Sequence, residues 1–171
     1  MNLKKGFTHQ NFLKKISGGF TLIELLVVVA IVGILASITL GYLGSARKKG
    51  DDTAVKSNLA TMRSVGELFY LNNSNSYLPT EGLTFSIATC PIYDVAGTNM
   101  LSRDKVIASS VAEAVYRGVG SSCYNSDNIW AVAVGLKLVP NTSWCVDVQG
   151  TAKVVNSVPS SAINSSTFLC N

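Results

Sequence analysis

The chain has 171 residues, enough for one domain and an anchoring segment, and only 14% of them are charged. Its formal net charge of +4 is local, because residues 1–19 hold four lysines (Lys4, Lys5, Lys14 and Lys15) and no acid, which leaves 14 − 4 = 10 basic residues against 10 acidic ones. A nucleic-acid-binding domain would instead carry basic side chains clustered on its folded surface, so the composition argues against that class.

The first predicted element is an apolar helix. Residues 25–46 are 22 residues without a formal charge; as a helix they measure about 33 Å, enough to cross a hydrocarbon core of about 30 Å. A cleavable secretory signal is the alternative, since Gly44-Ser45-Ala46 resembles its cleavage site. The apolar region of such a signal is only about 7–15 residues long, which favours a membrane-spanning helix.

The cysteines indicate which side of the membrane the body occupies. Basic residues flank the apolar run on both sides and do not decide its orientation. All four cysteines follow the run, at spacings of 33, 22 and 25 residues without a C-x-x-C pair. This pattern favours disulfides over zinc and predicts a cytoplasmic N-terminus with an exported body.

A second, amphipathic stretch follows directly. Apolar or small residues recur at steps of 4, 3, 4 and 3, namely Val55, Leu59, Met62, Gly66 and Phe69. An Asn- and Ser-rich run at 72–76 and Pro79 end the pattern. Unless the chain breaks at Gly41, Gly44 or Gly50, one helix of roughly 78 Å is expected over about residues 20–71.

The remaining residues predict a small head. Residues 83–88 and 129–139 are strand candidates, 104–116 is a helix candidate, and 144–148 with 152–155 form a hairpin around Gln149-Gly150-Thr151. Trp130 and Trp144 are expected to pack in the core and the hairpin, and 158–167 is expected to be loop. The fold class is therefore α+β, a long N-terminal helix whose second half packs on a small antiparallel sheet.

One acid stands near the front of the apolar run. Glu24 would be unfavourable by up to a few kcal/mol at a bilayer centre, so it needs a partner there. The alternative is a carboxylate that reaches the membrane edge. Its surroundings, GGFTLIELLVV at residues 18–28, resemble the class III signal of type IV pilins and type II secretion pseudopilins. The resemblance is close from Gly18 to Lys48 and looser to Pro79.

The resemblance implies processing and assembly. A prepilin peptidase would cut between Gly19 and Phe20, next to Gly18, and methylate the new amino group of Phe20. Glu24 would neutralise that amino group on a neighbouring subunit, since a charge in an apolar bundle is tolerated only when paired.

A ridge of small residues supports self-packing. Gly33, Ser37, Gly41 and Ser45 recur every four residues, and such ridges let helices approach closely in lipid; the alternative is a helix that merely contains small residues. Pilins of this kind often carry a proline near position 41, so we expect local weakening of the helix at Gly41 and Gly44.

The segment 144–150 resembles a strand and turn near the C-terminus of many such subunits. On that basis we expect the pairs Cys145–Cys170 and Cys90–Cys123, although four cysteines allow three connectivities and the sequence does not choose among them.

Catalysis is not expected. The one histidine, His9, lies in the predicted leader, and phosphate-loop, zinc-protease and calcium-loop patterns are absent, so we expect no cofactor and no metal. Asp51-Asp52 is the one adjacent carboxylate pair, and it is expected to be a solvated charge cluster beside Lys48 and Lys49.

The resulting hypothesis has three segments: a leader (1–19), a transmembrane assembly helix (20–46) and an exported head (47–171). The chain would be a structural subunit of a pilus-like filament for adhesion, twitching motility or DNA uptake, meeting nucleic acid only through the assembled filament. Implied partners are further copies, the peptidase, an assembly ATPase, a platform protein and the inner membrane, which the precursor spans once. Alternatives are a pseudopilin of a periplasmic pseudopilus and a monomeric, signal-anchored binding protein.

Overall fold

The computed structural model describes residues 19–79 and 84–171. Residues 1–18 of the predicted leader, with His9 and Gly18, lie outside these residues. The chain divides into two units, Met1–Gly41 and Tyr42–Asn171, and we call the second unit the head. The elements in chain order are α1 (Leu22–Asn72), β1 (Phe85–Ala88), α2 (Met100–Arg103), α3 (Lys105–Arg117), β2 (Ser121–Asn125), β3 (Trp130–Gly135), β4 (Ser143–Asp147), β5 (Ala152–Val155) and α4 (Pro159–Ala162).

The long helix is a single element of 51 residues, within two residues of the predicted bounds. It continues through Gly41, Gly44 and Gly50, because glycine keeps its backbone donor and the i→i−4 ladder can run through it. It ends where the Asn- and Ser-rich run predicts. Ser74 and Asn75 adopt positive φ angles of 56° and 58°, and the Asn75 N–H donates to the carbonyl of Tyr70.

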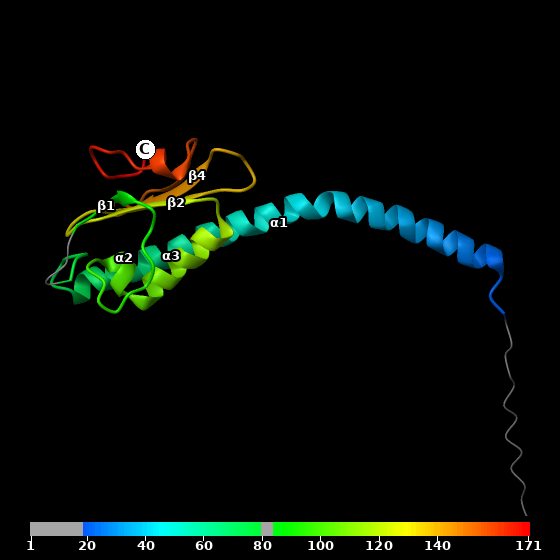
Figure 1. The fold of residues 1–171 in the computed structure, drawn as a ribbon, viewed down its shortest axis with the longest axis horizontal. Helices are drawn as coiled ribbons and strands as arrows, with labels where there is room; N and C mark the ends of the chain where they lie inside the picture. Colours follow the sequence, from blue (N-terminus) through cyan, green and yellow to red (C-terminus); the bar gives the residue numbers. More distant parts are fainter. Residues whose placement is uncertain (1–18, 80–83) are drawn as a thin grey trace, which may run out of the picture. The chain divides into compact units, whose positions relative to one another are not determined.

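The sheet of the head is a five-stranded antiparallel meander in the order β1-β2-β3-β4-β5. Its two faces bury different layers (Figure 1). Trp130, Val132 and Val134 of β3 pack in a large core with α1 and α3. Ala131 and Ala133 pack on the other face with Cys145 and with Ala162 of α4. Since β3 is buried on both faces, its sequence is a continuous apolar run rather than an alternating one.

The predicted stripe of α1 is the face that enters this core. Val55, Leu59 and Met62 are fully buried. Residues off the stripe also contact the head: the Lys56 ammonium lies 4.9 Å from the Trp144 ring centroid, and an Arg63 N–H donates to the carbonyl of Gly150 at 3.1 Å. The second half of α1 is therefore held by polar contacts in addition to its apolar stripe.

Four parts of the head differ from the prediction. Strand β2 and the short helix α2 were not predicted. The predicted strand 129–139 stops at Gly135, and the loop 158–167 contains α4 and an isolated bridge between Ile163 and Cys170. Strand β2 has the polar sequence SSCYN, so its strand conformation depends on pairing with β1 and β3 rather than on its own apolar pattern.

The head contains the disulfides Cys90–Cys123 and Cys145–Cys170, the pairs expected from the resemblance. The first joins the end of the β1 segment to β2. The second joins β4 to the penultimate residue of the chain, whose N–H also donates to Asp147 at 3.0 Å.

Candidate functional site

Glu24 caps the N-terminus of its own helix, α1, through hydrogen bonds with Thr21. Its Oε2 accepts the Thr21 backbone N–H at 2.9 Å and the Thr21 hydroxyl at 2.8 Å, and the Glu24 N–H donates back to the Thr21 hydroxyl at 3.3 Å. This is a capping box, a Thr-x-x-Glu arrangement that satisfies two of the backbone donors left free in a first helical turn. This role was not predicted, although Thr-x-x-Glu before an apolar run is itself a helix-start signal.

The surroundings of Glu24 are apolar and unpartnered within the described chain. Phe20 and Ile23 are 81% and 69% exposed. An open hollow of about 370 Å³ lies beside the carboxylate, lined by Phe20, Ile23, Glu24, Val27 and Val28. Because a soluble monomer rarely exposes so much contiguous apolar surface, this end of the helix is built to meet lipid or another protein.

Of the predicted cleavage residues, Gly19 and Phe20 lie in exposed, non-helical chain directly before α1. Peptide hydrolysis between them would create an ammonium group on Phe20, one residue from the Thr21 N–H that Glu24 already accepts. The Glu24 carboxylate is therefore already bonded to the residue that follows Phe20, where the new positive charge would arise.

The small residues Gly33, Ser37 and Gly41 are also exposed on α1. A Cβ atom added at Gly33 or Gly41 would meet nothing within 4 Å. The Ser37 hydroxyl donates to the carbonyl of Ile34 at 2.8 Å, so Ser37 presents no unused hydroxyl donor to an apolar neighbour. Nothing inside the described chain therefore requires small residues at these positions.

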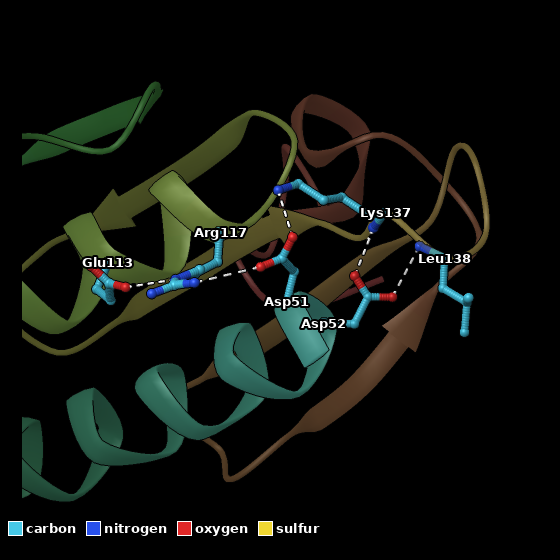
Figure 2. Close-up of polar contacts among 6 residues, drawn as sticks. All are labelled: Asp51, Asp52, Glu113, Arg117, Lys137 and Leu138. Carbon is cyan, nitrogen blue, oxygen red and sulfur yellow. Dashed lines mark hydrogen bonds and ion pairs between the residues drawn. The ribbon is translucent and has the colours of Figure 1, made fainter. Parts of the chain in front are cut away.

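The carboxylate pair Asp51-Asp52 is not the solvated cluster that was predicted. Asp52 is only 6% exposed, and its two oxygens accept the backbone N–H groups of Lys137 and Leu138 at 2.7 and 3.1 Å (Figure 2). The prediction was wrong because these partners lie some 85 residues away, and buried carboxylates are satisfied by such backbone donors.

Asp51 joins a separate, more exposed set of charges. It pairs with the Lys137 ammonium at 2.9 Å and with Arg117 at 3.7 Å, and Arg117 pairs with Glu113 at 2.7 Å (Figure 2). The hydrogen bond from Lys137 lowers the pKa of Asp51, and the hydrogen bond to Glu113 raises the pKa of Arg117. These ion pairs join α1, α3 and the β3–β4 loop, so the role of Asp51 is to hold these elements of the head together.

The described residues show no group of three or more potential metal ligands. Helix α1 is long and apolar enough to cross a membrane, by length and composition. A long apolar helix with a capped, exposed start, whose second half packs on an antiparallel sheet, together with two disulfides, defines a pilin-like α+β protein.

Comparisons with known proteins agree with this class. Residues 14–40 match the model of the prokaryotic N-terminal methylation motif. The type IV wide pilus major component PilA4 of Thermus thermophilus is 41% identical over 69 residues, which are 40% of this chain and 52% of that protein. The type II secretion system core protein G of Klebsiella michiganensis is 37% identical over 65 residues (38% and 46%), and that of Escherichia coli K12 is 31% identical over 65 residues (38% and 45%).

The chain thus carries the class III signal with its methylation motif, and it is homologous to the type IV pilin PilA4 and to pseudopilin G, as its sequence indicated. The pilin class is structural and non-enzymatic. The chain spans about half the length of the curated relatives it matches. No solved structure matches it significantly.

Proposed function

We propose that the mature chain is the structural subunit of a type IV pilus-like filament that assembles from the inner membrane through α1. The observation that carries the proposal is the exposed apolar start of α1, with its capped Glu24, inside a matched methylation motif. The filament would serve adhesion, twitching motility or DNA uptake.

Processing comes first in this proposal. The peptidase removes residues 1–19 and methylates Phe20, leaving residues 20–46 as the transmembrane assembly helix and 47–171 as the exported head. The assembly ATPase and the platform protein then act on the membrane-embedded precursor. The exposed position of Gly19 and Phe20 outside the helix supports access for a peptidase.

Assembly then places the Phe20 ammonium of one copy against Glu24 of the next. Transfer of an unpaired carboxylate into an apolar bundle is strongly unfavourable, so pairing fixes the axial register between copies. The capping box supports this role, because it holds the carboxylate at the start of the helix before a neighbour arrives. The ridge of Gly33, Ser37 and Gly41 supports close approach of the helices.

A pseudopilin of a type II secretion system is the second candidate, supported by the similarity to core protein G. Surface filaments that disappear on deletion of the gene would favour the pilus over a short periplasmic pseudopilus. A monomeric signal-anchored protein is a third candidate, and it requires residues 1–19 to persist.

The decisive experiment measures the intact mass and N-terminal sequence of the protein extracted from cells, together with filament yield. We expect a chain that begins at methylated Phe20. Glu24→Ala should be processed normally and yield no filaments, whereas a chain beginning at Met1 would overturn the proposal.

Glu24→Gln separates charge from capping. The glutamine carbonyl oxygen can still accept the Thr21 N–H, but the side chain carries no charge. If pairing with an ammonium drives assembly, Glu24→Gln fails as Glu24→Ala does. Full filament yield from Glu24→Gln would show that Glu24 only caps its own helix.

A further inference from the structure

One end of the head combines cations, exposed apolar side chains and a hollow. We call it the basal surface and define it by Arg47, Lys48 and Lys49 of α1, the β3–β4 loop (136–142), Val119 and Val158. All of these residues belong to the same unit, Tyr42–Asn171.

The loop is fixed beside α1 by Asp52. Because this carboxylate accepts two successive N–H groups of the loop, the backbone at Lys137 and Leu138 is held in one position. The side chain of Leu138 points away from Asp52 (Figure 2). Leu138 and Val139 are 44% and 55% exposed, so the anchored loop presents two adjacent apolar side chains to the surroundings.

A hollow of about 410 Å³ opens between the loop and α1. It is lined by Lys48 of α1, by Pro140 and Thr142 of the loop, and by Val119 and Val158. Two lysines, Lys48 and Lys137, thus line a mostly apolar depression, and the Lys137 ammonium is paired with Asp51. In the described ranges the cations that form ion pairs are Arg117 and Lys137, so Arg47, Lys48 and Lys49 remain available to anionic groups.

The position along α1 identifies the occupant. The uncharged run ends at Ala46, so Lys48 lies about 3 Å and Asp52 about 9 Å beyond it along the helix. Each headgroup region of a bilayer is about 5–8 Å thick. When residues 25–46 span the hydrocarbon core, Lys48 therefore lies at the depth of the headgroups, and the loop held by Asp52 lies at their outer edge.

We propose that the basal surface rests on anionic phospholipid headgroups, with phosphate near Lys48 and the upper acyl chain or glycerol in the hollow against Val119 and Val158. Leu138 and Val139 are exposed on the loop that borders the hollow and would contact the same lipids. Basic and apolar side chains together are typical of surfaces that bind the membrane interface. The contact orients the head of the membrane-embedded subunit before assembly. It rests on the membrane insertion in the proposed function.

The test uses the processed full-length chain in vesicles whose phospholipids carry brominated acyl chains, which quench nearby tryptophan. Val139→Trp reports on the loop, Val32→Trp on membrane insertion, and Leu71→Trp on an exposed site 23 residues along α1 from Lys48. The unsubstituted chain gives the background of Trp130 and Trp144. We expect strong quenching for Val32→Trp and Val139→Trp, and none above background for Leu71→Trp.

The same Val139→Trp reporter should be quenched at least twofold more in vesicles containing phosphatidylglycerol than in pure phosphatidylcholine. Quenching equal to that of Leu71→Trp would overturn the lipid contact, while quenched Val32→Trp would leave membrane insertion intact. An unquenched Val32→Trp would instead contradict the proposed function. Protection of the Val139→Trp reporter from aqueous acrylamide only in filaments would assign the basal surface to contacts between copies and overturn the lipid proposal.

Discussion

The carboxylate of Asp52 accepts the backbone N–H of Leu138, 86 residues further along the chain, at 3.1 Å. With the neighbouring bond from Lys137 it joins the long helix to the β3–β4 loop of the head. The sheet and helix stripe bury apolar groups that many sequences could supply, whereas this contact requires a carboxylate at one position. It therefore fixes where the sheet lies along α1.

Asp52→Asn should destabilise the head by about 2–3 kcal/mol, because the amide nitrogen cannot accept and leaves one buried N–H without a partner. The measurement is urea unfolding of the full chain in detergent, followed by the fluorescence of Trp130 and Trp144, both in the head. Asp51→Asn is the matched control and should cost less than about 1 kcal/mol, because its ion pairs are more exposed. Equal losses for the two variants would show that the buried bonds of Asp52 have no special weight.

Alkaline pH should unfold the head partly through Tyr77. This side chain is 3% exposed, its hydroxyl donates to Glu67 at 3.2 Å, and burial raises its pKa to about 12. The folded state thus favours the protonated phenol, and the contribution to stability is complete below pH 10 and is lost as the pH rises toward 12. The loss attributable to Tyr77 is at most about 2–3 kcal/mol.

The check compares the free energy of unfolding at pH 9.5 and pH 11 in the unsubstituted chain and in Tyr77→Phe. The phenylalanine variant should lose less stability over this interval, since other titrating groups are common to both chains. If the unsubstituted chain and Tyr77→Phe lose the same free energy of unfolding between pH 9.5 and pH 11, Tyr77 ionises as readily in the folded head as in the unfolded chain.

The parts of the molecule that the sequence predicts are those set by local pattern. Helix α1, helix α3 and the β4–β5 hairpin depend on periodicity, caps and a turn: Asp104 accepts from Val106 and Ile107 at the start of α3, and Gly150 takes a positive φ in the hairpin turn. The methylation motif is likewise a contiguous string, so it too could be predicted.

The parts that could not be predicted depend on distant residues. Strand β2 is polar and is a strand only because β1 and β3 flank it. The burial of Asp52 follows from the β3–β4 loop, which lies some 85 residues further along the chain. The capping box at Glu24 was predictable from Thr21, and it was missed because the acid was considered only as a charge in a membrane.

The disulfide pairing can be read from a single digest. Trypsin sites at Arg103, Arg117, Lys137 and Lys153 place each cysteine on its own peptide. Without reduction, the peptide 64–103 should be linked to 118–137, and 138–153 to 154–171. Any crossed pair would contradict the structure. Replacing Cys145 and Cys170 together with serine should cost about 2–4 kcal/mol, because the last residues are then released from the Ala131 face.

The ridge on α1 makes a prediction that separates folding from assembly. Since a side chain at Gly41 meets nothing within 4 Å, Gly41→Leu should leave processing and unfolding of the head unchanged. In a filament the added atoms would enter a close helix–helix contact, and overpacking of that kind costs about 1–3 kcal/mol per contact. Filament yield by electron microscopy should therefore fall about tenfold or more. Ala36→Leu adds a similar side chain to another face of the same helix and should reduce the yield less; if the two variants assemble equally well, small residues at Gly41 do not mediate contact between copies.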